Sequence, residues 1–361
     1  MPRELIATAP GKAELREYKE APLGEDDIRI KVEFASPKHG TESHNFKSDN
    51  LKKKTRFDSD YRIFLPMDEP RDVFPRKLGN MAVGVVTETG SRVEGFKPGD
   101  RVYGHMAVRE THLRKDNPED PHAEPPLGSG VRESRLHHMP EGIRPEDIVL
   151  ADPCHFALAA VRDASVRVGE WVAVFGLGAI GLMIVQLVKR CGAERIFAVD
   201  PLENRRNIAA RLGAEKTFDP TACDVGREIK ALTGTKGVDV AIDASGSYRA
   251  LQAAMRTVHY SGLLVTCSYY HGDASPLRLD EEFFLGRITI RASMPVWGNP
   301  CRDYPMWDDE RIEDTVYRMI VNGNLDTDGF IDPISSFDEC HKAYMFASEH
   351  PEKCVKLGIR F

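Results

Sequence analysis

The sequence predicts an α/β protein that combines a β-rich domain with a doubly wound parallel sheet. Short runs of Val, Ile and Phe at a period of two, closed by Gly or Pro-Gly, occupy the first third of the chain, as in residues 28–36, 81–90 and 95–104. From residue 166, apolar strands alternate with helical patterns of about 10–15 residues, which is typical of a parallel sheet covered by helices. At 361 residues the chain is also long enough for two cores.

The elements of the second part follow in a regular order. EWVAVFG (170–176) is an apolar run that ends in glycine, as expected of a buried parallel strand, and residues 179–192 form a helical pattern that also ends in glycine. Further strands and helices follow, and after about residue 294 the chain becomes irregular again. The remaining predicted elements are strands 194–200, 238–246, 261–270, 287–293 and 354–361 and helices 205–215, 309–322 and 337–349.

Composition and charge exclude several classes of protein. The formal net charge of −7 argues against a nucleic-acid-binding surface, because contact with phosphates requires an excess of basic residues. No run of about 18 apolar residues is present, so we expect no membrane span. The first residues lack the apolar core of a signal peptide, and the seven cysteines include no CxxC pair. We therefore expect reduced thiols and a cytoplasmic protein.

Two polar segments interrupt the β-rich part. Residues 47–64 include three consecutive lysines, which are too polar for a core strand, so we expect a solvated insertion within residues 45–78. The alternative is a lid or an oligomer arm near His39. Residues 116–130 are rich in Pro, Gly and Asp and predict a loop.

The strongest motif is VFGLGAIG, in which Gly176, Gly178 and Gly181 form G-x-G-x-x-G between a strand and a helix. The first glycine suits a tight turn, the second lets a pyrophosphate approach the backbone, and the third lets the helix pack on the strand. The helix N-terminus at Ala179 and Ile180 offers free N–H groups to the phosphates. The motif therefore predicts a dinucleotide-binding site.

The choice of dinucleotide depends on Asp200, which stands 19 residues after Gly181 at the end of the next strand. Its carboxylate suits hydrogen bonds from both ribose hydroxyls, and its charge would repel a 2′-phosphate. This favours NAD over NADP. Arg205 leaves the choice open to some degree, because an arginine beyond the strand can reach the ribose or a phosphate.

The order of these parts resembles the medium-chain, zinc-type alcohol dehydrogenases over nearly the whole chain. The resemblance is carried by GFKPGDRV (95–102), the GLGAIG turn, the D-x-x-x-x-R run from Asp200 to Arg205 and SGLLVTCS (261–268). The cofactor half is similar to the polyol, sugar and threonine dehydrogenases. The resemblance implies a GroES-like catalytic domain of residues 1–150 and 295–361, and a Rossmann domain of residues 151–294 that binds NAD.

The resemblance also places the catalytic residues. The family pattern C-G-[ST]-D-x-x-H corresponds here to HGTESH, with His39 at the position of the cysteine ligand. Thr41, Glu42 and His44 keep the pattern. Around this stretch the sequence shows neither a helical period nor a clean strand.

The other zinc-ligand positions depart from the family. The family's G-H-E becomes Gly79-Asn80-Met81, and its later ligand position falls at Asp152. The cysteines of the family's structural zinc site are absent. Since zinc requires about three protein ligands from Cys, His, Asp or Glu, we expect no metal; if one binds, His39 and Asp152 are the implied ligands.

We interpret the HGTESH stretch as an acid–base loop that replaces a metal site. Histidine suits this role because its unperturbed pKa of about 6.5 lies close to working pH. Asp152 or Glu42 would orient the ring of His39, and Thr41 and His44 resemble the family's relay of protons to solvent. The alternative is a polar loop whose histidines make ordinary hydrogen bonds.

Four further residues are assigned to the cofactor site by the resemblance. Ser245, Cys267 and Tyr269 lie at strand ends that would face the nicotinamide, although such side chains more often pack in cores. Lys356 stands where the family has a basic residue on the pyrophosphate. An ordinary surface lysine is the alternative.

These observations predict an NAD-dependent oxidoreductase that moves a hydride between a secondary alcohol and the nicotinamide, without zinc. The resemblance implies a polyol, sugar or cyclitol-like substrate and a homodimer or homotetramer. Two alternatives remain open at this point. One is a metal-free reductase of C=C or C=N bonds, and the other is a catalytically inactive nucleotide-binding homologue.

Overall fold

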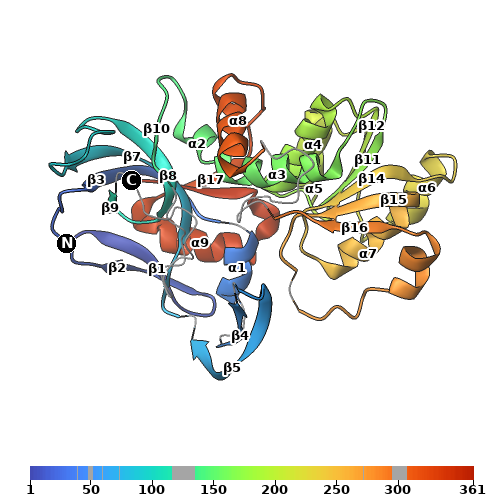
Figure 1. The fold of residues 1–361 in the computed structure, drawn as a ribbon, viewed down its shortest axis with the longest axis horizontal. Helices are drawn as coiled ribbons and strands as arrows, with labels where there is room; N and C mark the ends of the chain where they lie inside the picture. Colours follow the sequence, from blue (N-terminus) through green and yellow to red (C-terminus); the bar gives the residue numbers. More distant parts are fainter. Residues whose placement is uncertain are drawn as a thin grey trace. The chain divides into compact units, whose positions relative to one another are not determined.

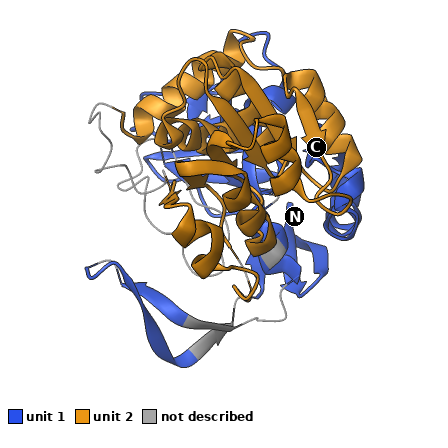
Figure 2. Cartoon of the chain, turned by 90° about the vertical axis from the view of Figure 1, so that its right-hand side faces the viewer, with its two compact units in different colours: residues 1–149, 331–361 blue, residues 150–330 orange. Residues whose placement is uncertain are grey.

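The computed structural model describes residues 1–38, 40–47, 52–58, 60–72, 74–115, 135–270, 272–294 and 307–361. The chain forms two compact units, Met1–Val149 with Ile331–Phe361 and Leu150–Phe330 (Figure 2). Among the described residues, no helix is long and apolar enough to cross a membrane.

Unit 1 is β-rich, as predicted. Its larger sheet has the order β10-β8-β7-β3-β18-β17, with β9 also paired to β3, and its smaller sheet has the order β2-β1-β6. The strands are β1 (Arg3–Ala9), β2 (Lys12–Glu17), β3 (Asp27–Ser36), β6 (Arg76–Lys77), β7 (Gly79–Thr89), β8 (Arg101–Ala107), β9 (Thr111–Lys115), β10 (His137–His138), β17 (Ile331–Ser336) and β18 (Lys356–Arg360). The helices are α1 (Gly40–Lys47), α2 (Pro145–Ile148) and α9 (Cys340–Glu349).

The core of unit 1 follows from the period of two in β3. Ile28, Ile30 and Val32 point to the interior and are almost fully buried, while Lys31 between them is exposed. The C-terminal strand β18 pairs antiparallel with β3, so the end of the chain completes this sheet. The predicted strand at 95–104 begins later, at Arg101, because Lys97-Pro98-Gly99 forms a turn in which Gly99 has φ +96°.

Helix α1 corrects the expectation for the stretch around HGTESH, which showed no helical period. Gly40, Thr41, Ser43 and Asn45 are weak helix formers, so intrinsic propensity does not explain this helix. Tertiary contacts stabilise it instead, since Phe46 is fully buried against the core of unit 1.

The predicted insertion contains a hairpin of β4 (Lys52–Asp58) and β5 (Ile63–Asp72), which form a two-stranded sheet of their own (Figure 2). The three lysines therefore belong to a strand, but not to a core strand. Phe57 and Phe64 face each other across the hairpin with ring centroids 5.2 Å apart, and both are exposed. Such an isolated hairpin is marginally stable by itself.

Unit 2 contains the predicted parallel sheet, with the strand order β13-β12-β11-β14-β15-β16. Figure 1 shows α3, α4 and α5 on one face and α6 and α7 on the other. The order reverses between β11 and β14, which is the switch point where doubly wound sheets bind ligands. The strands are β11 (Trp171–Phe175), β12 (Arg195–Val199), β13 (Lys216–Phe218), β14 (Val238–Asp243), β15 (Val258–Thr266) and β16 (Thr289–Ala292). The helices are α3 (Ala151–Ala164), α4 (Ala179–Arg190), α5 (Glu203–Leu212), α6 (Val225–Leu232), α7 (Tyr248–Thr257) and α8 (Asp309–Val321), with a π-helical turn at Leu279–Phe283.

The described residues 307–330 group with unit 2, whereas the sequence analysis placed the return to the first domain at residue 295. Two contacts explain this grouping. The guanidinium of Arg162 in α3 lies 3.5 Å from the ring centroid of Trp307, and the side-chain amide of Gln186 donates to the carbonyl of Asp326 at 3.0 Å.

Candidate active site

The glycine turn of unit 2 has the geometry that the motif predicts. Gly176 has φ +80°, and a Cβ atom there would lie 2.6 Å from the Cα of Ser245. A Cβ at Gly181 would collide with the carbonyl oxygen of Gly176, so only glycine lets α4 pack so closely on the turn. A Cβ at Gly178 would meet nothing within 4 Å, so this position faces open space.

Asp200 fastens this turn to the end of β12. The carboxylate of Asp200 accepts the backbone N–H of Leu177 at 2.7 Å and that of Leu202 at 2.8 Å, and it is buried. The guanidinium of Arg205 in α5 lies 3.9 Å away. A carboxylate has about four acceptor positions, so these two backbone N–H groups do not use all of those of Asp200.

The turn fits a dinucleotide. Helix α4 begins at Ala179 and Ile180, where the first N–H groups of a helix have no partner within the helix, and its N-cap residue Gly178 carries no side chain to cap them. Such a helix start, with no side chain at Gly178 in the way, is suited to hold the pyrophosphate of a dinucleotide.

The loop after β14 supports the turn from the neighbouring strand. Asp243 is fully buried, and its carboxylate accepts the backbone N–H of Ser245 at 2.9 Å and the phenol hydroxyl of Tyr270. Burial raises the pKa of Asp243. The buried thiol of Cys267 donates to the carbonyl of Asp243 at 3.6 Å, whereas Tyr269 is exposed.

In unit 1, Glu42 is buried and both of its carboxyl oxygens are engaged. One oxygen accepts the backbone N–H of Gly79 at 2.9 Å, and the other accepts the hydroxyl of Tyr344 at 3.0 Å. Burial raises the pKa of Glu42 to about 7, although these hydrogen bonds and the charges of Arg76 and Lys356 act in the opposite direction.

Lys356 is also buried rather than on the surface. Its ammonium donates to the carbonyl of Pro37 at 2.7 Å, in the same unit as Glu42. Its assignment to the pyrophosphate stays a prediction. The positions of the other predicted catalytic residues are described only in part: His39 lies outside the described residues, as do the side chains of Thr41 and His44.

Among the described residues, which do not include the candidate ligand His39, no three His, Cys, Asp or Glu side chains gather closely enough to hold a metal ion. Asp152 is buried in the first turn of α3, in unit 2. On β7, the side chains of Asn80 and Met81 are buried at the positions of the family's G-H-E. An amide and a thioether are poor ligands for Zn²⁺, so this part of the donor set does not fit zinc.

Sequence reasoning missed two tyrosines. Tyr344 in α9 contacts Glu42 across 302 residues of sequence, and no local pattern could reveal that contact. Tyr270, and not its neighbour Tyr269, reaches the interior of unit 2 and stacks on Tyr248 with ring centroids 5.1 Å apart. An aspartate that ends the apolar strand VDVAID was the available signal for a buried acid that needs a donor.

Comparison with known proteins agrees with this geometry. The model of the alcohol dehydrogenase GroES-like domain matches residues 24–133, and that of the zinc-binding dehydrogenase matches residues 179–303. The chain is 37% identical over 364 residues to D-guloside 3-dehydrogenase of Escherichia coli K12, covering 99% of this chain and 100% of the relative.

Two solved structures share the fold. The crystal structure of 2R,3R-butanediol dehydrogenase from Bacillus subtilis has a TM-score of 0.74 at 23% identity, with 100% of both chains covered. A short chain alcohol dehydrogenase from E. coli CFT073, complexed with cofactor NADH, has a TM-score of 0.73 at 16% identity, covering 100% of this chain and 99% of that chain.

A GroES-like unit followed by a dinucleotide-type sheet defines a medium-chain dehydrogenase. The chain belongs to the zinc-type alcohol dehydrogenase family. It is an oxidoreductase that acts on CH–OH groups, and a nicotinamide cofactor is typical of its family.

The buried carboxyl of Glu42 predicts a pH dependence of stability. Its pKa is about 7 when folded and near the ordinary 4.5 when unfolded, so between these values the folded state binds the proton more strongly. The stabilisation is complete below pH 4.5 and is lost as pH rises through 7, by about 3 kcal/mol at most. Glu42→Gln removes this ionisable group. The free energy of unfolding of the variant should therefore not fall as pH rises from 4.5 through 7, whereas that of the parent protein should. Urea unfolding from pH 5 to 8 measures it; parallel curves for the two proteins would contradict the prediction.

Proposed function

We propose that this protein is an NAD-dependent dehydrogenase of a secondary alcohol on a sugar, polyol or cyclitol-like molecule, and that it works without zinc. The observation that carries the cofactor assignment is the buried carboxylate of Asp200, which joins the end of β12 to the glycine turn. When bound, NAD would accept the hydride. The chain's own residues bind the dinucleotide, orient the alcohol and take its proton.

A sugar substrate is supported by the relative that matches the chain from end to end, which is a D-guloside 3-dehydrogenase. An identity of 37% over 99% of the chain extends through both units, so the support covers the catalytic half as well as the cofactor half.

Zinc independence is supported by the donor set. Asn80 and Met81 replace the histidine and glutamate of the family's G-H-E, which leaves His39 and Asp152 as two good ligands where zinc requires about three. Without a Lewis acid, the hydroxyl proton requires a base, and neutral imidazole suits that role. His39 is the proposed base, with Thr41 and His44 as its relay to solvent.

Asp152 is the proposed carboxylate partner of this imidazole. Glu42 is the alternative; it is buried and accepts hydrogen bonds from Gly79 and Tyr344. In this proposal, these contacts of Glu42 hold helix α1, on which it lies.

The cofactor assignment predicts that NAD binds at least about tenfold more tightly than NADP, because the charge of Asp200 disfavours a 2′-phosphate. Asp200→Asn keeps the shape and removes the charge, so it should narrow the difference between the two dissociation constants. Isothermal titration of both dinucleotides measures this. Tighter binding of NADP by the parent protein would show that the ribose assignment is wrong.

The base assignment predicts that His39→Asn lowers kcat by about 10²–10⁴, the contribution of general acid–base catalysis, with little change in the Kd for NAD. Alcohol oxidation should rise with pH through the pKa of the histidine, since only the neutral ring accepts a proton. A screen of sugars and polyols with NAD, with and without EDTA, provides the assay, and His350→Asn at an exposed position is the control. Turnover of His39→Asn near the parent's, or loss of activity with chelated zinc, would refute the mechanism.

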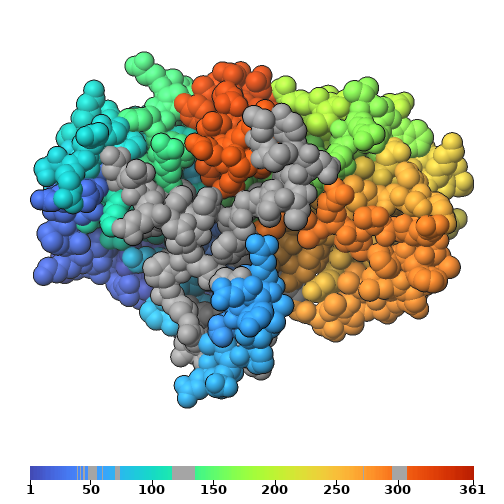
Figure 3. Space-filling view, in the orientation of Figure 1, coloured from blue at the N-terminus to red at the C-terminus, as the bar shows by residue number. Residues whose placement is uncertain are grey.

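We also propose that the protein assembles into a homodimer or homotetramer through the surface near β16. This strand is the edge of the sheet, all four of its residues are exposed, and the preceding segment exposes Leu279, Phe284 and Leu285 (orange in Figure 3). An exposed edge strand close in sequence to several exposed large apolar residues is typical of an interaction surface.

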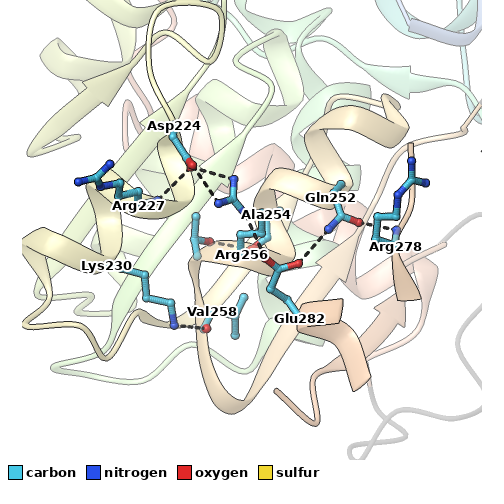
Figure 4. Close-up of polar contacts among 10 residues, drawn as sticks. Asp224, Arg227, Lys230, Gln252, Ala254, Arg256, Val258, Arg278 and Glu282 are labelled. Atoms are coloured by element: carbon cyan, nitrogen blue, oxygen red, sulfur yellow. Dashed lines mark hydrogen bonds and ion pairs between the residues drawn. The ribbon is translucent and has the colours of Figure 1, made fainter. Parts of the chain in front are cut away.

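The segment is held in place by a polar network (Figure 4). Glu282 accepts hydrogen bonds from Arg256 and Gln252 in α7, and Arg256 also pairs with Asp224, the N-cap residue of α6. These contacts fix one wall of a groove of about 580 Å³, whose floor includes Met255, Val258 and Ile288. The apolar surface is therefore preformed.

Leu285→Asp places a charge on this surface and should shift the protein toward the monomer in light scattering. Leu285 has a relative exposure of 72%, so the substitution costs little in the free chain. Val168→Asp, at an exposed apolar residue of unit 2, is the matched control and should leave the mass unchanged. A parent protein that is already monomeric would contradict the proposal.

A further inference from the structure

Two buried hydrogen bonds from the C-terminal part of the chain flank the position of His39. One comes from Lys356 in β18 and reaches Pro37, two residues before it, and the other comes from Tyr344 in α9 and reaches Glu42, three residues after it. All four described residues belong to unit 1.

The hydroxyl of Tyr344 makes a specific contact within a packed site. It donates to Glu42 at 3.0 Å, while its ring packs edge-on against Phe46 with centroids 5.0 Å apart. Glu42 and Phe46 both lie on α1, so Tyr344 contacts this helix at two places. Burial next to the carboxyl raises the pKa of Tyr344, so the phenol keeps its proton and remains a donor.

Burying the charged ammonium of Lys356 costs more free energy than burying the neutral hydroxyl of Tyr344. Burying a charged group in a protein interior is unfavourable unless it is hydrogen-bonded, and Lys356 is only 3% exposed. The neighbouring backbone is fixed as well, because the hydroxyl of Ser36 donates to the carbonyl of Leu357 at 2.8 Å. The backbone entering the segment at Pro37 is therefore tied to β18 on two consecutive residues.

We propose that Tyr344 and Lys356 are positioning residues, which hold the backbone at Pro37 and helix α1 at Glu42, on either side of the proposed base in the sequence. This rests on the proposed role of His39. Helix α1 is short and consists largely of weak helix formers, so the segment has little stability of its own. Anchors on both sides restrict its position, and a small misplacement of a catalytic group lowers the rate of the chemical step.

The proposal gives Lys356 a role different from that of a pyrophosphate ligand, and the two roles predict different kinetics. An anchor of the segment affects kcat and leaves NAD affinity unchanged. A pyrophosphate ligand affects the Kd for NAD. Tyr344 and Lys356 should then behave alike, although one is a neutral donor and the other is charged.

The experiment compares Tyr344→Phe and Lys356→Met with the parent chain. Each variant keeps the apolar part of the side chain and removes the donor. Each should lower kcat about tenfold, the order of one lost buried hydrogen bond, with the Kd for NAD unchanged. The controls are Tyr18→Phe, which removes a hydroxyl that donates to the carbonyl of Thr111, and Lys230→Met, which removes an ammonium that donates to the carbonyl of Val258. Both controls should keep the parental kcat.

Three outcomes would overturn the proposal. A Lys356→Met variant with a raised Kd for NAD and parental kcat would make Lys356 a pyrophosphate ligand. Parental kcat in Tyr344→Phe with a lower melting temperature would make its hydroxyl purely structural. Equal losses of kcat in the controls would show that removing any partly buried hydroxyl or ammonium donor lowers kcat, wherever it lies.

Combination with His39→Asn separates this proposal from the proposed function. If Tyr344 acts through His39, then Tyr344→Phe should cause no further loss in the His39→Asn background, and additive losses would overturn the coupling. If His39→Asn alone has parental turnover, the base assignment fails, and the anchoring is tested by amide hydrogen exchange. Exchange across residues 40–47 should then rise in Tyr344→Phe and not in Tyr18→Phe; unchanged exchange would overturn the anchoring too.

Discussion

Buried carboxylates that accept backbone N–H groups hold the loops on which the candidate site depends. Asp200 fixes the glycine turn through Leu177, and Glu42 fixes the start of β7 through Gly79. Asp243 fixes its own loop through Ser245. Loops at strand ends leave N–H groups without ladder partners, and a buried N–H without an acceptor is unfavourable. An acid placed beside the strand end therefore supplies the acceptor and determines where the loop lies.

Two of these acids also accept a hydrogen bond from a tyrosine hydroxyl. Glu42 pairs with Tyr344 in unit 1, and Asp243 pairs with Tyr270 in unit 2. Burial raises the pKa of both acids and of both phenols. Each tyrosine therefore keeps the proton that it donates, and each acid lies closer to protonation than an exposed one. The hydrogen bonds are stronger in this environment than in water. Burial also disfavours the ionised form of each carboxyl group.

The sequence was most informative where local pattern and function coincide. The parallel sheet, α4 and the glycine turn follow from apolar runs and from backbone conformations that only glycine adopts, as at Gly176. Helix α1 and the contact of Tyr344 were not predictable, because tertiary packing and a partner 302 residues away stabilise them. The hairpin β1–β2 and α3 were also not predicted. For Lys356, the family position predicts a role at the pyrophosphate, and its burial and its hydrogen bond to Pro37 could not be read from the sequence.

The departures from the family at the ligand positions are chemically consistent with one another. His39 in place of cysteine would by itself still suit zinc, since imidazole is a good ligand. Asn80 and Met81, which the sequence predicts at the positions of the family's histidine and glutamate, are both buried next to Gly79, whose backbone N–H is held by Glu42. If the predicted correspondence with G-H-E holds, β7 offers no zinc ligand at these two positions, while a hydrogen-bonded acid maintains its backbone position. Under the proposed mechanism, such a site needs a positioned base for proton transfer and not the three ligands that zinc requires.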